Sequence, residues 1–134
     1  MERHVVCRVD ELPPGQRKIV EVAGRGIGVF NVKGSYYALR NRCPHHAGPL
    51  CQGLMTGLVL GPEPYRYTFE RDGEILRCPW HGWEFDVTNG KSVFNPHRIK
   101  VRSYDVAVEP AEEEDASIET YPVSVERQLV VVYV

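Results

Sequence analysis

The chain contains two short stretches with one shared chemical pattern, CPHHAGPL at residues 43–50 and CPWHGW at residues 78–83. Each stretch pairs a cysteine with a histidine, spaced as C-x-H in the first and as C-x-x-H in the second. Thiolate and imidazole are ligands of zinc and of iron–sulfur centres. A glycine follows in each stretch, and glycine lets a backbone approach a bulky inorganic group without a side-chain clash. We therefore expect two loops that face each other around one metal centre.

The presence of one cysteine and one histidine in each loop bears on the kind of centre. A single tetrahedral zinc is well served by like pairs, such as C-x-x-C with H-x-x-x-H. A cluster of two irons has two distinguishable ends, so two similar loops can give both thiolates to one iron and both imidazoles to the other. The spacing favours the two-iron arrangement, and a structural zinc module is the alternative.

The rest of the chain has the composition of a β protein. Valine occurs 19 times and leucine 8 times, and β-branched residues favour strands. The 12 glycines and 10 prolines are scattered, as expected for short strands joined by turns. No segment keeps a helical period over the roughly ten residues that a helix assignment needs. Alternating patterns predict strands at residues 5–9, 18–22, 28–32, 36–39, 65–70, 74–77, 104–109, 120–125 and 128–134. We expect an all-β fold.

The segment between the two loops, residues 54–77, contains a signal for a hairpin. Asp72-Gly73 separates the strands predicted at 65–70 and 74–77. Asp-Gly is a strong signal for a two-residue hairpin turn. We therefore expect the chain to reverse at Asp72-Gly73.

Length and charge exclude several classes of protein. A chain of 134 residues fits one domain. Its 16 basic and 18 acidic residues give a net charge of −2, whereas a nucleic-acid binder normally carries a basic excess. No apolar run approaches the roughly 18 residues of a membrane helix, and the N-terminus lacks the apolar stretch of a signal peptide. We expect no nucleic-acid or membrane partner and a cytoplasmic location. The acidic run at residues 112–115 is interpreted as a solvated loop.

In order and in flanking residues, the two loops resemble the Rieske [2Fe–2S] domain. The resemblance continues through TNGK at 88–91, NP at 95–96 and YDVAV at 104–108. It implies an antiparallel Rieske (ISP-like) β-sandwich or barrel, a single domain over residues 1–134 with an inserted cluster-binding subdomain at about 42–96. It also implies one [2Fe–2S] cluster. The implied ligands are Cys43 and Cys78 on one iron, and His45 and His81 on the other.

Three features depart from the family pattern. The 32 residues between His45 and Cys78 exceed the usual spacing, and the predicted hairpin accounts for the excess. Trp80 stands where the respiratory-complex branch has a cysteine, so that branch's disulfide cannot form. Trp83 stands where the same branch has a hydroxyl that bonds a cluster sulfur. Fewer hydrogen bonds to sulfur predict a reduction potential in the lower half of the family range of about −150 to +300 mV.

The remaining cysteines and histidines have ordinary interpretations. We interpret His46 as an exposed neighbour of the site, Cys51 as a packed thiol and Cys7 as a core residue. A Cys7–Cys51 disulfide is disfavoured in a reducing compartment. The large ring of Trp80, between two candidate ligands, is expected to shield the centre from water, whereas Trp83 is expected in the core.

A cluster ligated entirely by protein has no open position for a substrate, which argues for one-electron transfer and against bond chemistry. We expect no catalytic residue and no enzymatic activity of the chain by itself. The resemblance implies a ferredoxin-like carrier between a reductase and an oxygenase or another redox enzyme. The alternative is a fixed electron-transfer subunit of a larger complex. The expected docking rim consists of His45, His46, Trp80 and His81.

Overall fold

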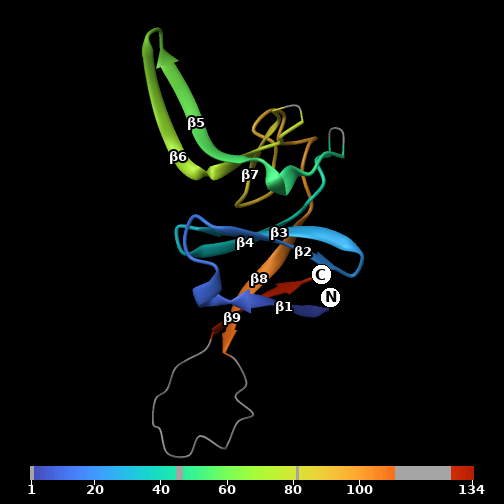
Figure 1. Cartoon of the computed structure of the whole chain (residues 1–134). Coiled ribbons are helices and arrows are strands. Elements are labelled where there is room, and N and C mark those ends of the chain that lie inside the picture. Colours follow the sequence, from blue (N-terminus) through green and yellow to red (C-terminus); the bar gives the residue numbers. More distant parts are fainter. Residues whose placement is uncertain (1, 45–46, 81, 111–127) are drawn as a thin grey trace, which may run out of the picture.

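The computed structural model describes residues 2–44, 47–80, 82–110 and 128–134, which form antiparallel strands and two short 3-10 helices (Figure 1). The strands are β1 (Arg3–Arg8), β2 (Arg17–Val22), β3 (Arg25–Val32), β4 (Ser35–Arg40), β5 (Leu54–Glu63), β6 (Arg66–Arg77), β7 (Glu84–Asp86), β8 (Ser103–Pro110) and β9 (Gln128–Tyr133). The 3-10 helices are η1 (Val9–Glu11) and η2 (Leu50–Gln52). The described residues contain no α-helix, and the all-β prediction is confirmed.

Six strands form one sheet in the order β1-β9-β8-β4-β3-β2, with antiparallel pairing throughout. The pairing of β1 with β9 brings the two ends of the chain together (Figure 1). Glu2 and Val134 exchange two backbone hydrogen bonds there, of 2.8 and 3.0 Å.

Strand β3 is buried on both faces, because it separates two apolar cores. Ile27 and Val29 pack with Val130 and Val132 inside the large sheet. The residues of opposite parity, Phe30 and Val32, pack in a second core that also contains Cys43 and Cys78 from the two Cys–His loops. Because alternate residues of a strand point to opposite faces, β3 contributes to both cores.

The second sheet has three strands in the order β5-β6-β7. Strands β5 and β6 form a long hairpin that projects away from the large sheet (Figure 1). The predicted turn at Asp72-Gly73 is wrong. The chain reverses at Pro64-Tyr65, because Glu63 pairs with Arg66, and Tyr65 takes a φ of 67° there.

Asp72-Gly73 instead lies inside β6, at a bulge. Thr56 pairs with Ile75 and Leu58 pairs with Glu70, so one residue of β5 faces four of β6. At the bulge, Arg71 and Gly73 have positive φ values of 55° and 80°. Gly57 accommodates it, since a Cβ there would lie 2.5 Å from the carbonyl oxygen of Glu70. Gly73 of the Asp-Gly pair therefore provides a positive φ for a bulge, and the strand continues beyond the bulge.

Three further points concern the sequence-based expectations. The strand predicted at 120–125 and the acidic run at 112–115 lie outside the described residues. None of the four cysteines is in a disulfide, so no Cys7–Cys51 disulfide is present. None of the helices in the described part of the chain has the length and hydropathy to cross a lipid bilayer.

Candidate metal centre

The first loop leaves β4 and closes on itself around Cys43. The Cys43 N–H donates to the carbonyl of Gly48 at 2.8 Å, and the Ala47 N–H donates to the carbonyl of Cys43 at 2.7 Å. Ala47 takes a positive φ of 58°, which turns the chain back. The backbone hydrogen-bonding groups of Cys43 are thus used within the loop.

The second loop, between β6 and β7, has the same backbone pattern. The Cys78 N–H donates to the carbonyl of Trp83 at 2.7 Å, and the Gly82 N–H donates to the carbonyl of Cys78 at 2.9 Å. Gly82 has a positive φ of 73°, at the offset from its cysteine that Ala47 has in the first loop. The two loops therefore share their closing hydrogen bonds as well as a Cys-Pro pair that is followed by a histidine.

The structure brings the two predicted thiol ligands together in one core. Cys43 and Cys78 are each 1% exposed and belong to the same buried cluster, with Leu50, Leu76 and Phe85. His45 and His81, the two predicted imidazole ligands, lie outside the described residues, as does His46. Two buried thiols that remain unjoined, in matched loops, fit a metal centre that takes thiolates from both loops.

Gly53 and Arg77 hold the bases of the two loops together. A Cβ on Gly53 would lie 1.8 Å from the carbonyl oxygen of Arg77, the residue that precedes Cys78. Arg17 donates from Nη1 to the carbonyl of Gly53 and, at 2.9 Å, to the carbonyl of Cys51. Gly53 was not among the residues predicted from the sequence, where it is only a glycine three residues beyond the stretch 43–50.

Trp80 bridges the loops. Its indole packs against Gly48, where a Cβ would lie 2.8 Å from the ring carbon Cδ2. The side chain remains 59% exposed, so one face covers the first loop and much of the rest meets solvent. Trp83 is partly buried against the core, with its ring edge-on to Phe94 at 6.1 Å between centroids.

The other two cysteines lie where packing explains them. Cys51 is fully buried against Gly28, and its thiol is 3.5 Å from the carbonyl oxygen of Leu39. Burial raises the pKa of the Cys51 thiol to about 12. Cys7 belongs to the other core, inside the large sheet, and burial raises the pKa of its thiol too. Both thiols remain protonated at neutral pH, unlike ligand thiolates.

A charge network supports the strand that follows the second loop. Asp86 in β7 accepts from Arg71 Nη1 at 2.8 Å and from the hydroxyl of Thr88 at 2.6 Å. Burial alone would raise the pKa of the Asp86 carboxyl, but the hydrogen bonds from Arg71 and Thr88 outweigh it and lower the pKa. Glu74 also binds Arg71, at 3.1 Å, and Lys33 at 3.1 Å. The network joins the bulge in β6 to the strand beyond the loop.

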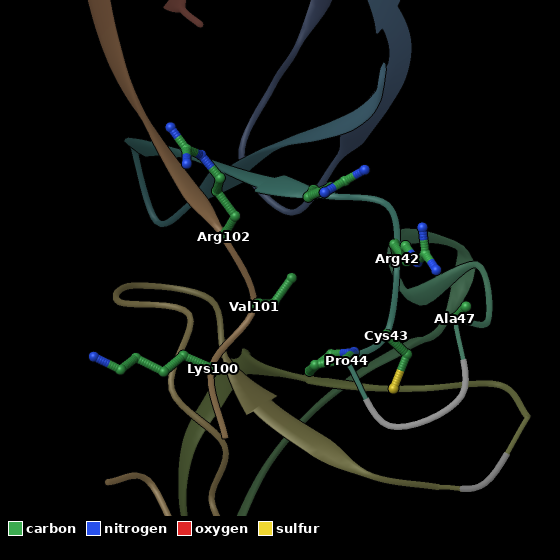
Figure 2. A pocket seen from close by; sticks show the side chains of 8 residues that line it. Arg42, Cys43, Pro44, Ala47, Lys100, Val101 and Arg102 are labelled. Atoms are coloured by element: carbon green, nitrogen blue, oxygen red, sulfur yellow. The ribbon is translucent and has the colours of Figure 1, made fainter. Parts of the chain in front are cut away.

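A basic pocket of about 440 Å³ lies beside the first loop (Figure 2). Cys43 lies on its wall together with four cationic side chains, Arg40, Arg42, Lys100 and Arg102. The sequence analysis did not find this pocket, because the cations come in two pairs, each separated by one residue, from segments about sixty residues apart.

The chain was compared with known proteins. A family model described as "Rieske [2Fe-2S] domain" matches residues 2–105. A Ralstonia protein, the ferredoxin component of naphthalene 1,2-dioxygenase/salicylate 5-hydroxylase systems, is 29% identical over 101 residues, which cover 75% of this chain and 82% of that protein. The solved ferredoxin of carbazole 1,9a-dioxygenase from Nocardioides aromaticivorans IC177 has a TM-score of 0.64 and 25% identity, over 97% of both chains.

A third relative is a longer protein. Mouse apoptosis-inducing factor 3 is 28% identical over 104 residues, which cover 78% of this chain but 14% of that protein. The match therefore concerns one part of a longer chain.

Proposed function

The chain belongs to the Rieske [2Fe–2S] domain family, and from this premise we propose that it carries single electrons as a ferredoxin-like component, from a reductase to a terminal oxygenase or another redox enzyme. The observation that carries the proposal is the pair of matched loops, which bury Cys43 and Cys78 in one core without joining them in a disulfide. Relatives of similar length, of which the chain covers most, are ferredoxin components.

One Rieske-type [2Fe–2S] cluster is the cofactor of this family. We propose that Cys43 and Cys78 bind one iron and that His45 and His81 bind the other. The bound cluster supplies a one-electron couple, and four protein ligands leave no position for a substrate. This favours electron transfer over bond chemistry at the site.

The described residues prepare the site for that role in two ways. The closing hydrogen bonds fix the backbone of Cys43 and Cys78, which limits rearrangement when the charge of the cluster changes. Trp80 lies over Gly48 and restricts the access of water to the first loop. Its 59% exposure also leaves an aromatic surface that a partner protein can contact.

Two more proposals concern the whole chain. We propose a single domain over residues 1–134, with a cluster-binding subdomain at about 42–96; the separate sheet β5-β6-β7 supports this division. We also propose a cytoplasmic location, which is supported by four cysteines that form no disulfide.

The decisive experiment is to reduce the purified protein with dithionite and to record its EPR spectrum. We expect one electron per chain and a rhombic signal whose mean g value is well below that of clusters ligated only by cysteine. Zinc without iron or acid-labile sulfide would instead establish the structural zinc module.

The alternative of a fixed subunit has one specific observation in its favour, since a similar segment is part of a longer protein in mouse. Size-exclusion chromatography of the native protein with its neighbouring gene products separates the two forms. A carrier elutes alone, whereas a fixed subunit co-elutes with its partner.

A further inference from the structure

The basic pocket beside Cys43 has an unusual charge for this molecule. Its wall carries two cations from the end of β4 and the start of the first loop, Arg40 and Arg42, and two from the segment before β8, Lys100 and Arg102 (Figure 2). Among the described residues, no acidic side chain lines it. The whole chain has 16 basic and 18 acidic residues, so removing these four leaves 12 against 18, a net charge of −6. The pocket is therefore a positive region on an otherwise acidic molecule.

Backbone contacts hold the two sides of the pocket together. The Arg40 N–H donates to the carbonyl of Arg102 at 2.8 Å, which ties the end of β4 to the segment before β8. The Val101 N–H donates to the carbonyl of Gly90 at 2.8 Å. These hydrogen bonds fix the backbone positions from which the four cationic side chains extend.

The charges themselves are available to a ligand. Arg42, Lys100 and Arg102 are exposed, and Arg40 is partly exposed. The Arg102 guanidinium lies over the ring of Tyr104, 5.4 Å from its centroid. The four cations form no ion pair with any acidic residue in the described ranges.

We infer that this pocket is the docking site for carboxylate side chains on an acidic face of the redox partner. The inference rests on the proposed function, because it assumes an electron-transfer partner. A partner seated there lies against the loop of Cys43, and opposite charges steer such encounters and raise their rate. In Figure 2 the sulfur of Cys43 points away from the Arg42 guanidinium.

The first test uses small redox probes of opposite charge. Ferricyanide takes one electron from the dithionite-reduced protein and becomes ferrocyanide, with no bond or proton change. The net charge of −2 by itself predicts repulsion, so the rate would rise with salt. The basic pocket predicts the reverse. The rate at which ferricyanide oxidises the reduced protein should fall as the salt concentration rises, whereas the rate of oxidation by a tripositive cobalt complex should not fall.

Single substitutions locate the effect. Arg42→Gln and Lys100→Gln should each lower the ferricyanide rate at low salt by about two- to fivefold. Lys18→Gln removes the same charge from an exposed site on β2 and should change the rate by less than about 1.5-fold.

A second arm probes the proposed occupant. A hexaglutamate peptide should slow ferricyanide oxidation of the unmodified protein and should lose this effect in Arg42→Gln. Inorganic phosphate at equal ionic strength should inhibit weakly; inhibition as strong as that of the peptide would overturn the inference in favour of a small-anion site.

The two proposals fail in different ways. If the protein takes up no electron from dithionite, the proposed function fails. If one electron passes to ferricyanide but the pocket variants match Lys18→Gln, the function stands and the docking site is overturned.

Discussion

The indole of Trp80 lies so close to Gly48 that a Cβ at position 48 would be 2.8 Å from Cδ2 and 3.0 Å from Cγ of the ring. One residue comes from each metal-site loop, so this contact joins the loops directly. It also explains why a small residue follows the first motif. The glycine is needed for the space that the ring occupies, since Gly48 is not among the residues with positive φ.

The contact predicts the effect of Gly48→Ala. The added methyl group must displace the Trp80 ring, and overpacking of this kind costs about 1–3 kcal/mol. We expect the cluster to be lost to air several times faster, measured as bleaching of its visible absorbance. Gly26→Ala is a matched control, because its Cβ would meet Asn41 at an ordinary 3.4 Å.

A rescue variant separates this contact from a general loss of stability. Trp80→Leu removes the ring, so the double variant Gly48→Ala/Trp80→Leu should be no less stable than Trp80→Leu alone. Additive losses in the double variant would contradict the contact.

Substitutions of the cysteines should have two kinds of effect, depending on whether the cysteine is a proposed ligand. Cys43→Ser and Cys78→Ser should yield protein without the EPR signal, because each removes a proposed ligand. Cys51→Ala should keep the signal and lower the free energy of unfolding by about 1–3 kcal/mol, as a small core deletion does. With a pKa of about 12, Cys51 should also resist iodoacetamide at pH 8 in the folded protein. Loss of the cluster in Cys51→Ala would contradict this assignment.

Most of the strands could be predicted from local pattern, as the example of β3 shows. Ile27, Val29, Phe30 and Val32 form an apolar run whose alternate members face two cores. The position of the hairpin turn could not be predicted, because the pair Asp72-Gly73 is favourable both in a hairpin turn and in a β-bulge. The register in which β6 pairs with β5 decides between a turn and a bulge, and this register depends on residues distant in the sequence.

The candidate site shows the same division. The thiol positions Cys43 and Cys78 follow from local motifs, and the structure buries both in one core. The approach of Gly53 to Arg77 could not be predicted, since it depends on the relative position of two loops distant in sequence. The imidazole positions His45 and His81 lie outside the described residues and remain predictions.

The bulge predicts how the hairpin responds to substitution. Gly57→Ala would place a Cβ 2.5 Å from the carbonyl oxygen of Glu70, and backbone cannot move aside cheaply. We expect a loss of about 1–3 kcal/mol in the free energy of unfolding by urea. Tyr65→Gly at the true turn should be neutral or stabilising by up to about 1 kcal/mol, since Tyr65 has a positive φ of 67°. The opposite order would restore Asp72-Gly73 as the turn.

The reduction potential is expected in the lower half of the Rieske range. Position 83 is a tryptophan whose ring packs edge-on against Phe94, so it offers no hydroxyl to a cluster sulfur. Protein-film voltammetry should give a midpoint below about +100 mV. A midpoint above about +100 mV would contradict this prediction.

The Arg71–Asp86 pair predicts a specific dependence of stability on pH. The folded pKa of Asp86 is below its ordinary value, so its contribution is complete above the unfolded pKa and is lost as the pH falls through the folded pKa. Arg71→Gln should lower the free energy of unfolding at pH 7 by about 1–2 kcal/mol, discounted because the Arg71 side chain is 37% exposed. The deficit should shrink as the pH falls below about 4, the ordinary pKa of an aspartate in the unfolded chain, and it should disappear once the pH has passed the lower folded pKa of Asp86.

Arg77→Gln is the control, since its 3.4 Å pair with Glu84 is more exposed and should contribute less. Equal deficits for the two variants at pH 7, unchanged on acidification, would show that the buried pair does not support the strand beyond the second loop.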